Sequence, residues 1–118
     1  MKLQQILNSL QKLHPKEIDL SLDRIKKLCE KLGNPQDNLK YISVIGTNGK
    51  YSTIQAIRAI LKDANINCNI YTSPHIQKIN ERFIYNDQEI SDENLSKLLT
   101  EVEDINGGQP ITYFEILT

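Results

Sequence analysis

The residues best suited to chemistry lie in one glycine-containing segment, Gly46-Thr47-Asn48-Gly49-Lys50-Tyr51-Ser52-Thr53, called here the 46–53 segment. It stands between an apolar run and an amphipathic stretch. Glycines allow successive backbone N–H groups to face one anion, a helix N-terminus adds partial positive charge, and a lysine can reach the β- and γ-phosphates. Ser52 or Thr53 then supplies a hydroxyl to Mg²⁺. The segment therefore predicts binding of a nucleotide's phosphates.

A simpler interpretation of the same segment stays open at this point. The full GxxxxGK[ST] pattern of a phosphate-binding loop is not present. Gly46 and Gly49 would then only satisfy the backbone geometry of a strand-to-helix turn, and Lys50 would be solvated. The position between a predicted strand and a predicted helix favours the phosphate-binding interpretation.

The elements around this segment predict an α/β fold, a P-loop-type parallel sheet with flanking helices. The run 41–45 is short, β-branched and typical of a buried strand. The run 68–71 predicts the next strand. Between them lies a helical stripe of Ile54, Ile57, Ile60 and Leu61. Strand, loop, helix and strand form a βαβ unit, in which the crossover makes the two strands parallel.

Two helices are predicted before this unit. The first ends at His14-Pro15, because a residue before proline is disfavoured in a helix. Its apolar stripe consists of Leu3, Ile6, Leu7, Leu10 and Leu13. The second begins near Ser21, a plausible N-cap, and ends at Gly33 and Pro35. Its apolar face consists of Leu22, Ile25, Leu28 and Leu32.

Three further features are expected after the unit. Segments 81–85 and 89–90 flank Asn86-Asp87-Gln88 and predict a hairpin or a loop with a turn. Ser91-Asp92-Glu93 then caps a helix with apolar residues from Leu95 to Val102. Gly107-Gly108-Gln109-Pro110 breaks that helix. No repeat, low-complexity tract or linker argues for a second domain.

Composition excludes several classes of protein. The 118 residues carry 15 acidic and 14 basic side chains, a net charge of −1, so there is no global positive field for nucleic acid or an anionic membrane. No apolar run approaches the roughly 18–20 residues of a membrane-spanning helix. We see no secretory signal, which favours a cytoplasmic location. Cys29 and Cys68 lack any metal-ligand spacing and are expected to be reduced, partly buried thiols.

Several motifs, taken in order, resemble the folylpolyglutamate synthase/dihydrofolate synthase family of the Mur ligase superfamily. The central motifs are 45–53, Tyr71-Thr72-Ser73-Pro74-His75-Ile76 and Asn80-Glu81-Arg82-Phe83. The outer motifs are 18–25, 32–35 and Thr112-Tyr113-Phe114-Glu115. Their order and spacing match the N-terminal region of the family across essentially the whole chain.

The resemblance implies an ATP-dependent amide ligase that joins L-glutamate to dihydropteroate or a folate through an acyl phosphate. Lys50 would stabilise the charge that moves onto the γ-phosphoryl oxygens. The ATP-binding residues would be Thr47, Asn48, Gly49, Lys50 and Ser52. Ser73 matches a Mg²⁺ ligand of the family. Its alternative role is a hydroxyl that caps the turn before Pro74.

The resemblance also implies a pocket for pteroate or folate. One wall consists of Asp19, Leu20 and Ser21, and the other of Thr112, Tyr113, Phe114 and Glu115, where an aromatic ring stacks on a flat heterocycle. Without the resemblance, Ser21 reads as a helix cap, Asp19 as a solvated charge and Tyr113-Phe114 as core. His75 and Arg82 are further candidates near substrate and nucleotide, although a histidine after proline is equally often structural.

The chain departs from the family in two respects. Tyr51 stands where the family usually has glycine, and its effect on nucleotide affinity is open. Family members are several times longer, and Ile116 and Leu117 have no obvious partner here. We therefore expect residues 1–118 to be the N-terminal part of the ATP-binding domain of a longer ligase, monomeric at full length, with the C-terminal glutamate-binding domain absent and no turnover by the isolated chain.

Two alternative functions remain. The first is a stand-alone, non-catalytic ATP-binding module. The second is part of a Mur-type peptidoglycan ligase, against which the 73–75 and 80–82 segments argue, because they look like features of the folate branch. The resemblance leaves open whether dihydropteroate, a folate or both are used.

Overall fold

A computed structural model describes residues 2–14 and 21–118. The chain divides into two compact units, Met1–Leu39 with Ser91–Thr118, and Lys40–Ile90. The first unit contains α1 (Leu3–Leu13), α2 (Asp23–Lys31), the 3₁₀ helix η1 (Pro35–Asn38), α4 (Asp92–Asn106) and α5 (Tyr113–Leu117). The second contains α3 (Lys50–Asp63), β1 (Ile70–Tyr71), the 3₁₀ helix η2 (Ile79–Arg82), β2 (Phe83–Tyr85) and β3 (Gln88–Glu89). No helix of the described residues is long and apolar enough to cross a membrane.

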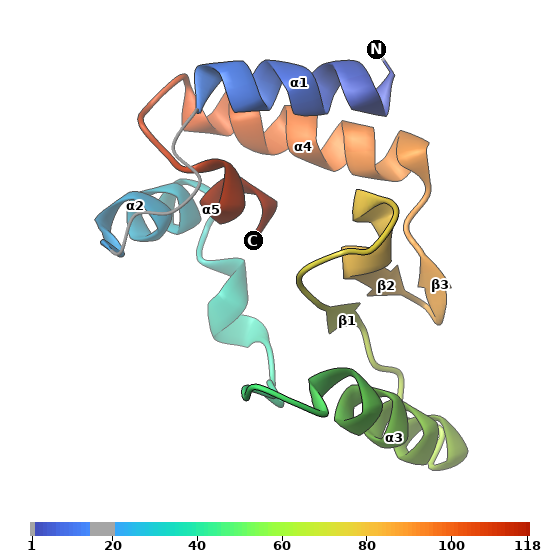
Figure 1. Cartoon of the computed structure of the whole chain (residues 1–118). Coiled ribbons are helices and arrows are strands. Elements are labelled where there is room, and N and C mark those ends of the chain that lie inside the picture. The colour runs from blue at the N-terminus through green and yellow to red at the C-terminus, as the bar shows by residue number, and fades with distance from the viewer. Residues whose placement is uncertain (1, 15–20) are drawn as a thin grey trace. The chain divides into compact units, whose positions relative to one another are not determined.

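The first unit is built on α1, which lies along α4 and runs in the same direction (Figure 1). The predicted stripe is confirmed, because its first four members, Leu3, Ile6, Leu7 and Leu10, are buried. Leu13 is exposed instead. The helix ends before His14, as expected, and the buried His14 ring lies against Glu103 of α4.

The N-cap of helix α2 lies one residue later than the predicted N-cap, Ser21. Its N-cap is Leu22, and Ser21 instead accepts a hydrogen bond at Oγ from the Asp23 backbone N–H, at 3.3 Å. Leu28 is the buried residue of this helix. The predicted stop is confirmed, because Gly33 follows the helix with a φ of +84°, a conformation that favours glycine.

Helices α4 and α5 are both capped at the N-terminus by a side chain. Ser91 Oγ accepts a hydrogen bond from the Asn94 backbone at 3.1 Å, as predicted. Gly107 ends α4 in the left-handed conformation. The expectation that Ile116 and Leu117 lack a partner is wrong, because both are buried in α5, which packs on α4.

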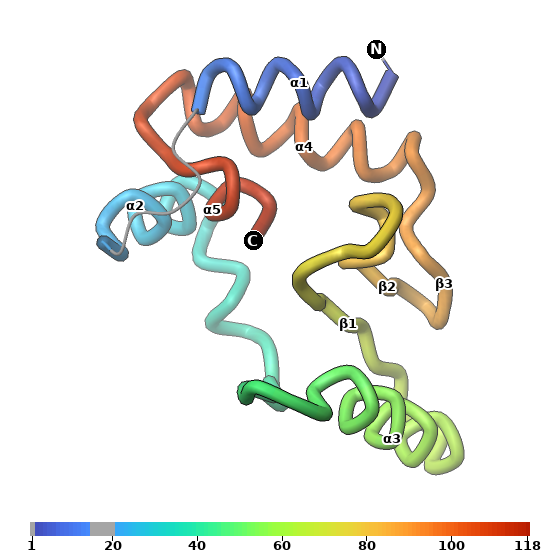
Figure 2. The backbone as a smooth tube through the Cα atoms, in the orientation of Figure 1, coloured from blue at the N-terminus to red at the C-terminus, as the bar shows by residue number. Residues whose placement is uncertain are grey.

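The sheet of the second unit is antiparallel, in the order β1-β2-β3. The hairpin around 86–88 is confirmed, and Tyr71 of β1 packs on Phe83 of β2 with ring centroids 5.3 Å apart. Helix α3 is joined to the hairpin turn, since Arg58 and Lys62 both contact the Asp87 carboxylate. Figure 2 follows this backbone from the loop before α3 into the hairpin.

The α/β class is confirmed, but the expected parallel βαβ pairing is not observed among the described residues. Segment 41–45 is not a strand, and Ile45 is 92% exposed. A strand requires a hydrogen-bonded neighbour, and β1 pairs with β2 instead of with 41–45. Cys29 and Cys68 are free and partly buried, as expected.

Candidate functional site

The 46–53 segment forms an exposed loop that leads directly into α3. Gly46 has a φ of +151° and Gly49 a φ of +76°, and residues that carry a side chain rarely adopt either backbone conformation. Gly49 is the N-cap of α3, and Lys50 is its first helical residue. The predicted loop-to-helix transition is therefore confirmed, with glycine at both points where the backbone demands it.

The start of α3 fits an anionic ligand. No acidic residue lies in its first turn, and its N-cap makes no side-chain hydrogen bond. The first N–H groups of a helix need partners from outside the helix and carry the positive end of its dipole. The Lys50 side chain is exposed and makes no hydrogen bond or ion pair within the described residues. Backbone and lysine are thus both available to phosphate oxygens.

The two candidate hydroxyls differ. Thr53 donates its hydroxyl hydrogen to the Gly49 carbonyl at 2.8 Å, inside the helix. Ser52 is exposed and makes no such bond among the described residues. Ser52 is therefore the hydroxyl of the pair that is not engaged inside the helix, and its role toward a ligand stays a prediction.

The loop that carries Ser73 and His75 has a defined internal structure. The Ser73–Pro74 peptide bond is cis. Arg82 donates from Nε to His75 Nδ1 at 2.8 Å, so the two further candidates of this loop are joined. The structure therefore brings His75 and Arg82 together, and their roles toward a ligand stay a prediction.

Glu81 fixes the backbone of the same loop, a role that sequence reasoning missed. Its carboxylate accepts hydrogen bonds from three consecutive backbone N–H groups, those of Ile76 at 2.8 Å, Gln77 at 3.1 Å and Lys78 at 3.2 Å. These bonds, the one from Ile76 foremost, lower the pKa of the Glu81 carboxyl from its usual value. The only sequence signal was its place between Asn80 and Arg82.

A metal site is not complete in the described part of the chain. No group of three or more His, Cys, Asp or Glu side chains there is arranged to hold a metal ion. Ser73 contributes a single hydroxyl, whereas Mg²⁺ prefers several oxygen ligands, usually with one or two carboxylates. The described residues therefore do not by themselves fit a bound Mg²⁺.

The outer motifs belong to the other unit. Asp19 and Leu20 lie outside the described residues, whereas Ser21 and Thr112–Glu115 are described. Thr112 caps α5, since its Oγ1 accepts from the Glu115 N–H at 3.1 Å and Glu115 Oε1 accepts from the Thr112 N–H at 3.2 Å. Phe114 is 45% exposed, so its ring is not core, contrary to the simpler interpretation.

Arg24 joins the 18–25 motif to the 112–115 motif, and it was not among the site residues predicted from the sequence. Its guanidinium contacts Glu115 Oε1 from Nε and from Nη2, each at 2.9 Å. Glu115 Oε2 is buried and has no hydrogen-bond partner among the described residues. The pair spans 91 positions of sequence, and no local pattern signals such a contact.

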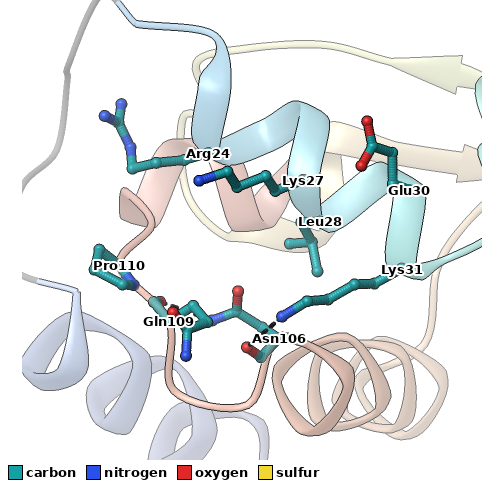
Figure 3. Close-up of a pocket in the computed structure, with 8 residues that line it drawn as sticks. All are labelled: Arg24, Lys27, Leu28, Glu30, Lys31, Asn106, Gln109 and Pro110. Carbon is teal, nitrogen blue, oxygen red and sulfur yellow. Dashed lines mark hydrogen bonds between the residues drawn. The ribbon is translucent and has the colours of Figure 1, made fainter.

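A hollow of about 620 Å³ lies in the first unit beside Arg24 (Figure 3). It has the volume of a small-molecule pocket. Lys31 of α2 reaches across it and donates to the Asn106 carbonyl at 3.4 Å. The hollow is lined by Arg24, Lys27, Leu28, Glu30, Lys31, Asn106, Gln109 and Pro110. None of these residues was predicted as a site.

The candidate residues thus fall into two groups. The nucleotide candidates, Ser73, His75 and Arg82 all belong to the Lys40–Ile90 unit. The described folate candidates, Ser21 and Thr112–Glu115, all belong to the other unit.

No protein-family model matches the chain. Among curated proteins, it is 38% identical over 112 residues to a dihydrofolate synthase/folylpolyglutamate synthase of Haemophilus influenzae, covering 95% of this chain. It is 34% identical over 109 residues to the Escherichia coli protein of the same name, covering 92% of this chain. The chain spans about a quarter of the length of these relatives, 25% and 26%.

Solved structures agree with these relatives. Escherichia coli FolC in complex with DHPP and ADP matches with a TM-score of 0.89 and 32% identity, over 99% of this chain and 28% of that one. Folylpolyglutamate synthase/dihydrofolate synthase with Mn, AMPPNP and L-glutamate bound matches with a TM-score of 0.86 and 34% identity, over 98% of this chain and 28% of that one. The described backbone thus follows that of nucleotide-bound enzymes nearly from end to end.

Proposed function

Because this chain belongs to the folylpolyglutamate synthase/dihydrofolate synthase family, we propose that it is part of an ATP-dependent ligase that adds L-glutamate to dihydropteroate, a folate or both. The observation that carries the proposal is the match over 99% of the chain to an enzyme bound to DHPP and ADP. We favour this function over a Mur-type peptidoglycan ligase, because the relatives reported above are named for folate substrates.

The chemistry proposed is acyl activation followed by amide formation. A carboxylate is a poor acylating agent, so ATP first phosphorylates it, and the glutamate amine then displaces phosphate from the acyl phosphate. The protein's part in phosphoryl transfer is largely to position the groups and stabilise charge. Lys50 and the uncapped N–H groups of α3 are suited to that part. Thr47, Asn48, Gly49 and Ser52 complete the proposed phosphate site.

The metal is proposed to be Mg²⁺, with Ser73 as one ligand. Solved relatives with Mn and AMPPNP support a divalent ion beside the nucleotide. A bound divalent ion would neutralise phosphate charge. Its carboxylate ligands are proposed to lie outside the residues described here, because no group of three or more His, Cys, Asp or Glu side chains among these is arranged to hold a metal ion.

The proposed folate pocket uses the outer motifs. Asp19, Leu20 and Ser21 form one wall, and Thr112–Glu115 the other. The half-exposed Phe114 ring is available to stack on a pteridine, and it lies in a turn whose end residues, Thr112 and Glu115, are buried. His75 and Arg82 are proposed to face the substrate or nucleotide.

We also propose a location, an oligomeric state and a class of partners for the enzyme. We place it in the cytoplasm, acting on small molecules as a monomer at full length, without a nucleic-acid or membrane partner. The glutamate-binding domain is proposed to lie in sequence beyond this chain, so the isolated 118 residues are expected to show no glutamate-dependent ADP release.

Backbone amide NMR of the chain tests the assignment of both sites. ADP should shift the amides of 46–53, and dihydropteroate those of Ser21 and 112–115. A chain that binds ADP but not dihydropteroate would support the stand-alone ATP-binding module instead. A chain that binds neither would contradict the proposed sites altogether.

A further inference from the structure

We infer that Arg24 and Glu115 are a pair of positioning residues that hold the Phe114 turn in its place in the folate pocket. The inference rests on the proposed function, which assigns the Thr112–Glu115 turn to that pocket. Neither side chain needs to touch the substrate for this role. The pair acts through the turn that carries the aromatic ring.

Three polar contacts converge on one oxygen. Glu115 Oε1 accepts hydrogen bonds from Arg24 Nε at 2.9 Å and from the Thr112 backbone N–H at 3.2 Å, and it forms an ion pair with Arg24 Nη2 at 2.9 Å. The same atom therefore closes the cap of α5 and receives the guanidinium of α2. Removing the Arg24 guanidinium therefore alters the oxygen that binds the backbone N–H of Thr112, the first residue of the turn.

Burial makes this contact strong. The Glu115 side chain is 8% exposed and that of Arg24 21%. Charged hydrogen bonds away from solvent gain strength, and leaving one member of such a pair unpaired is costly. Without Arg24, the Glu115 carboxylate would have to reach solvent, and it would leave the α5 cap to do so.

The Thr112–Glu115 turn has buried end residues and an exposed aromatic ring between them. Thr112 is 1% exposed and Glu115 is buried, whereas Phe114 between them is 45% exposed. The five-residue α5 is too short to be stable alone. The direction of the Phe114 ring therefore depends on the two anchors, and one of these is fixed by Arg24.

Loss of the Arg24–Glu115 pair should affect the binding of one ligand and not of the other. Loss of the pair should weaken binding of a pteridine-bearing substrate and leave nucleotide binding unchanged, because the 46–53 segment belongs to the other unit. A residue that merely stabilised the whole chain would affect both ligands. This difference separates positioning from general stability.

The experiment compares Arg24→Ala, Arg24→Lys and Glu115→Gln with Lys26→Ala, a matched control on the exposed side of α2. Calorimetric titration should show at least a tenfold rise in the dihydropteroate Kd for Arg24→Ala and Glu115→Gln. Arg24→Lys should recover part of the loss, and the double variant Arg24→Ala/Glu115→Gln should be no worse than either single variant. The ADP Kd should stay within twofold throughout.

Hydrogen exchange separates a failure of this inference from a failure of the proposed function. The amides of Glu115 and Ile116 bond to Thr112. Their exchange should accelerate at least tenfold in Arg24→Ala and not in Lys26→Ala, with or without a ligand. Equal exchange in the two variants would overturn the positioning role, even if dihydropteroate binds. Accelerated exchange in a chain that binds no dihydropteroate would contradict only the folate assignment. In the calorimetric experiment, additive losses of dihydropteroate affinity in the double variant would contradict the coupling between Arg24 and Glu115.

Discussion

Arg82 donates a hydrogen bond from Nε to Nδ1 of His75, at 2.8 Å. An imidazole nitrogen that accepts a hydrogen bond carries no proton, so in this contact any proton on the ring is on Nε2. The arginine therefore determines which of the two ring nitrogens carries the proton and can donate a hydrogen bond. In the loop after the Ser73–Pro74 bond, this leaves Nε2–H as the donor that His75 can offer to a phosphate or carboxylate.

The first prediction follows from that contact. In Arg82→Ala, His75 should lose its single tautomer, because the Arg82 Nε–H is the donor that holds Nδ1 unprotonated among the described residues. Side-chain ¹⁵N shifts at pH 7.5 should show protonated Nε2 in the wild type and a mixture in the variant. Arg58→Ala, which removes a guanidinium that contacts Asp87, is the control. A mixed tautomer already present in the wild type would contradict the prediction.

The second prediction concerns pH and Glu81. Backbone hydrogen bonds lower the pKa of this carboxyl in the folded chain. The unfolded chain therefore takes up the proton first as pH falls, so the stability that the charge contributes is full above the unfolded pKa, near 4.5. It is lost as pH falls through the lower folded pKa.

The corresponding measurement is thermal unfolding between pH 7 and pH 3. Glu81→Gln should unfold at a lower temperature than the wild type at neutral pH, and the difference should close in acid. Glu101→Gln, on the exposed side of α4, should show no such gap. A difference that grows as pH falls would show that the charged form is not the stabilising one.

The third prediction concerns the contact of α1 with α4. His14 is buried, and its Nε2 lies 3.0 Å from Oε2 and 3.1 Å from Oε1 of Glu103. Glu103→Ala leaves a buried ring nitrogen without its partner, which should cost about 1–3 kcal/mol in the free energy of unfolding. Urea denaturation measures this cost, with Glu101→Ala as the control, and an equal effect of the two variants would contradict it.

The amphipathic helices could be predicted from sequence because their information is local. The spacing of Leu3, Ile6, Leu7 and Leu10 defines one face, and that face is buried. Ser91 and Gly107 likewise mark the ends of α4 within a few residues of where they act. The phosphate-loop candidate was found for the same reason, since glycine, lysine and helix start are adjacent in the chain.

What could not be predicted depends on partners far away in sequence. Segment 41–45 has the composition of a strand, but composition does not supply the neighbour that a strand needs, and the segment is not paired. The Arg24–Glu115 pair joins residues 91 positions apart, so neither residue signals the other. The burial of Ile116 was missed because its partner helix, α4, is recognisable only in three dimensions.

The fourth prediction concerns Tyr51, which stands beside the proposed phosphate-binding lysine. The side chain lies in the first turn of α3 and is 71% exposed. The proposed phosphate site uses the loop backbone and Lys50 and not this ring, so Tyr51→Gly should leave the ADP Kd within about twofold. The glycine should instead destabilise α3, by up to about 0.5 kcal/mol, on helix propensity alone. A large change in ADP affinity would show that the ring contacts the nucleotide.

Calorimetric titration of the chain with ADP shows whether the start of α3 and Lys50 bind the phosphates of a nucleotide. We expect saturable binding by the wild type, unchanged binding by Lys97→Met on α4, and at least a tenfold loss of affinity in Lys50→Met, which is about 1.4 kcal/mol. Equal ADP affinity in Lys50→Met and the wild type, or no ADP binding by the wild type, would contradict it.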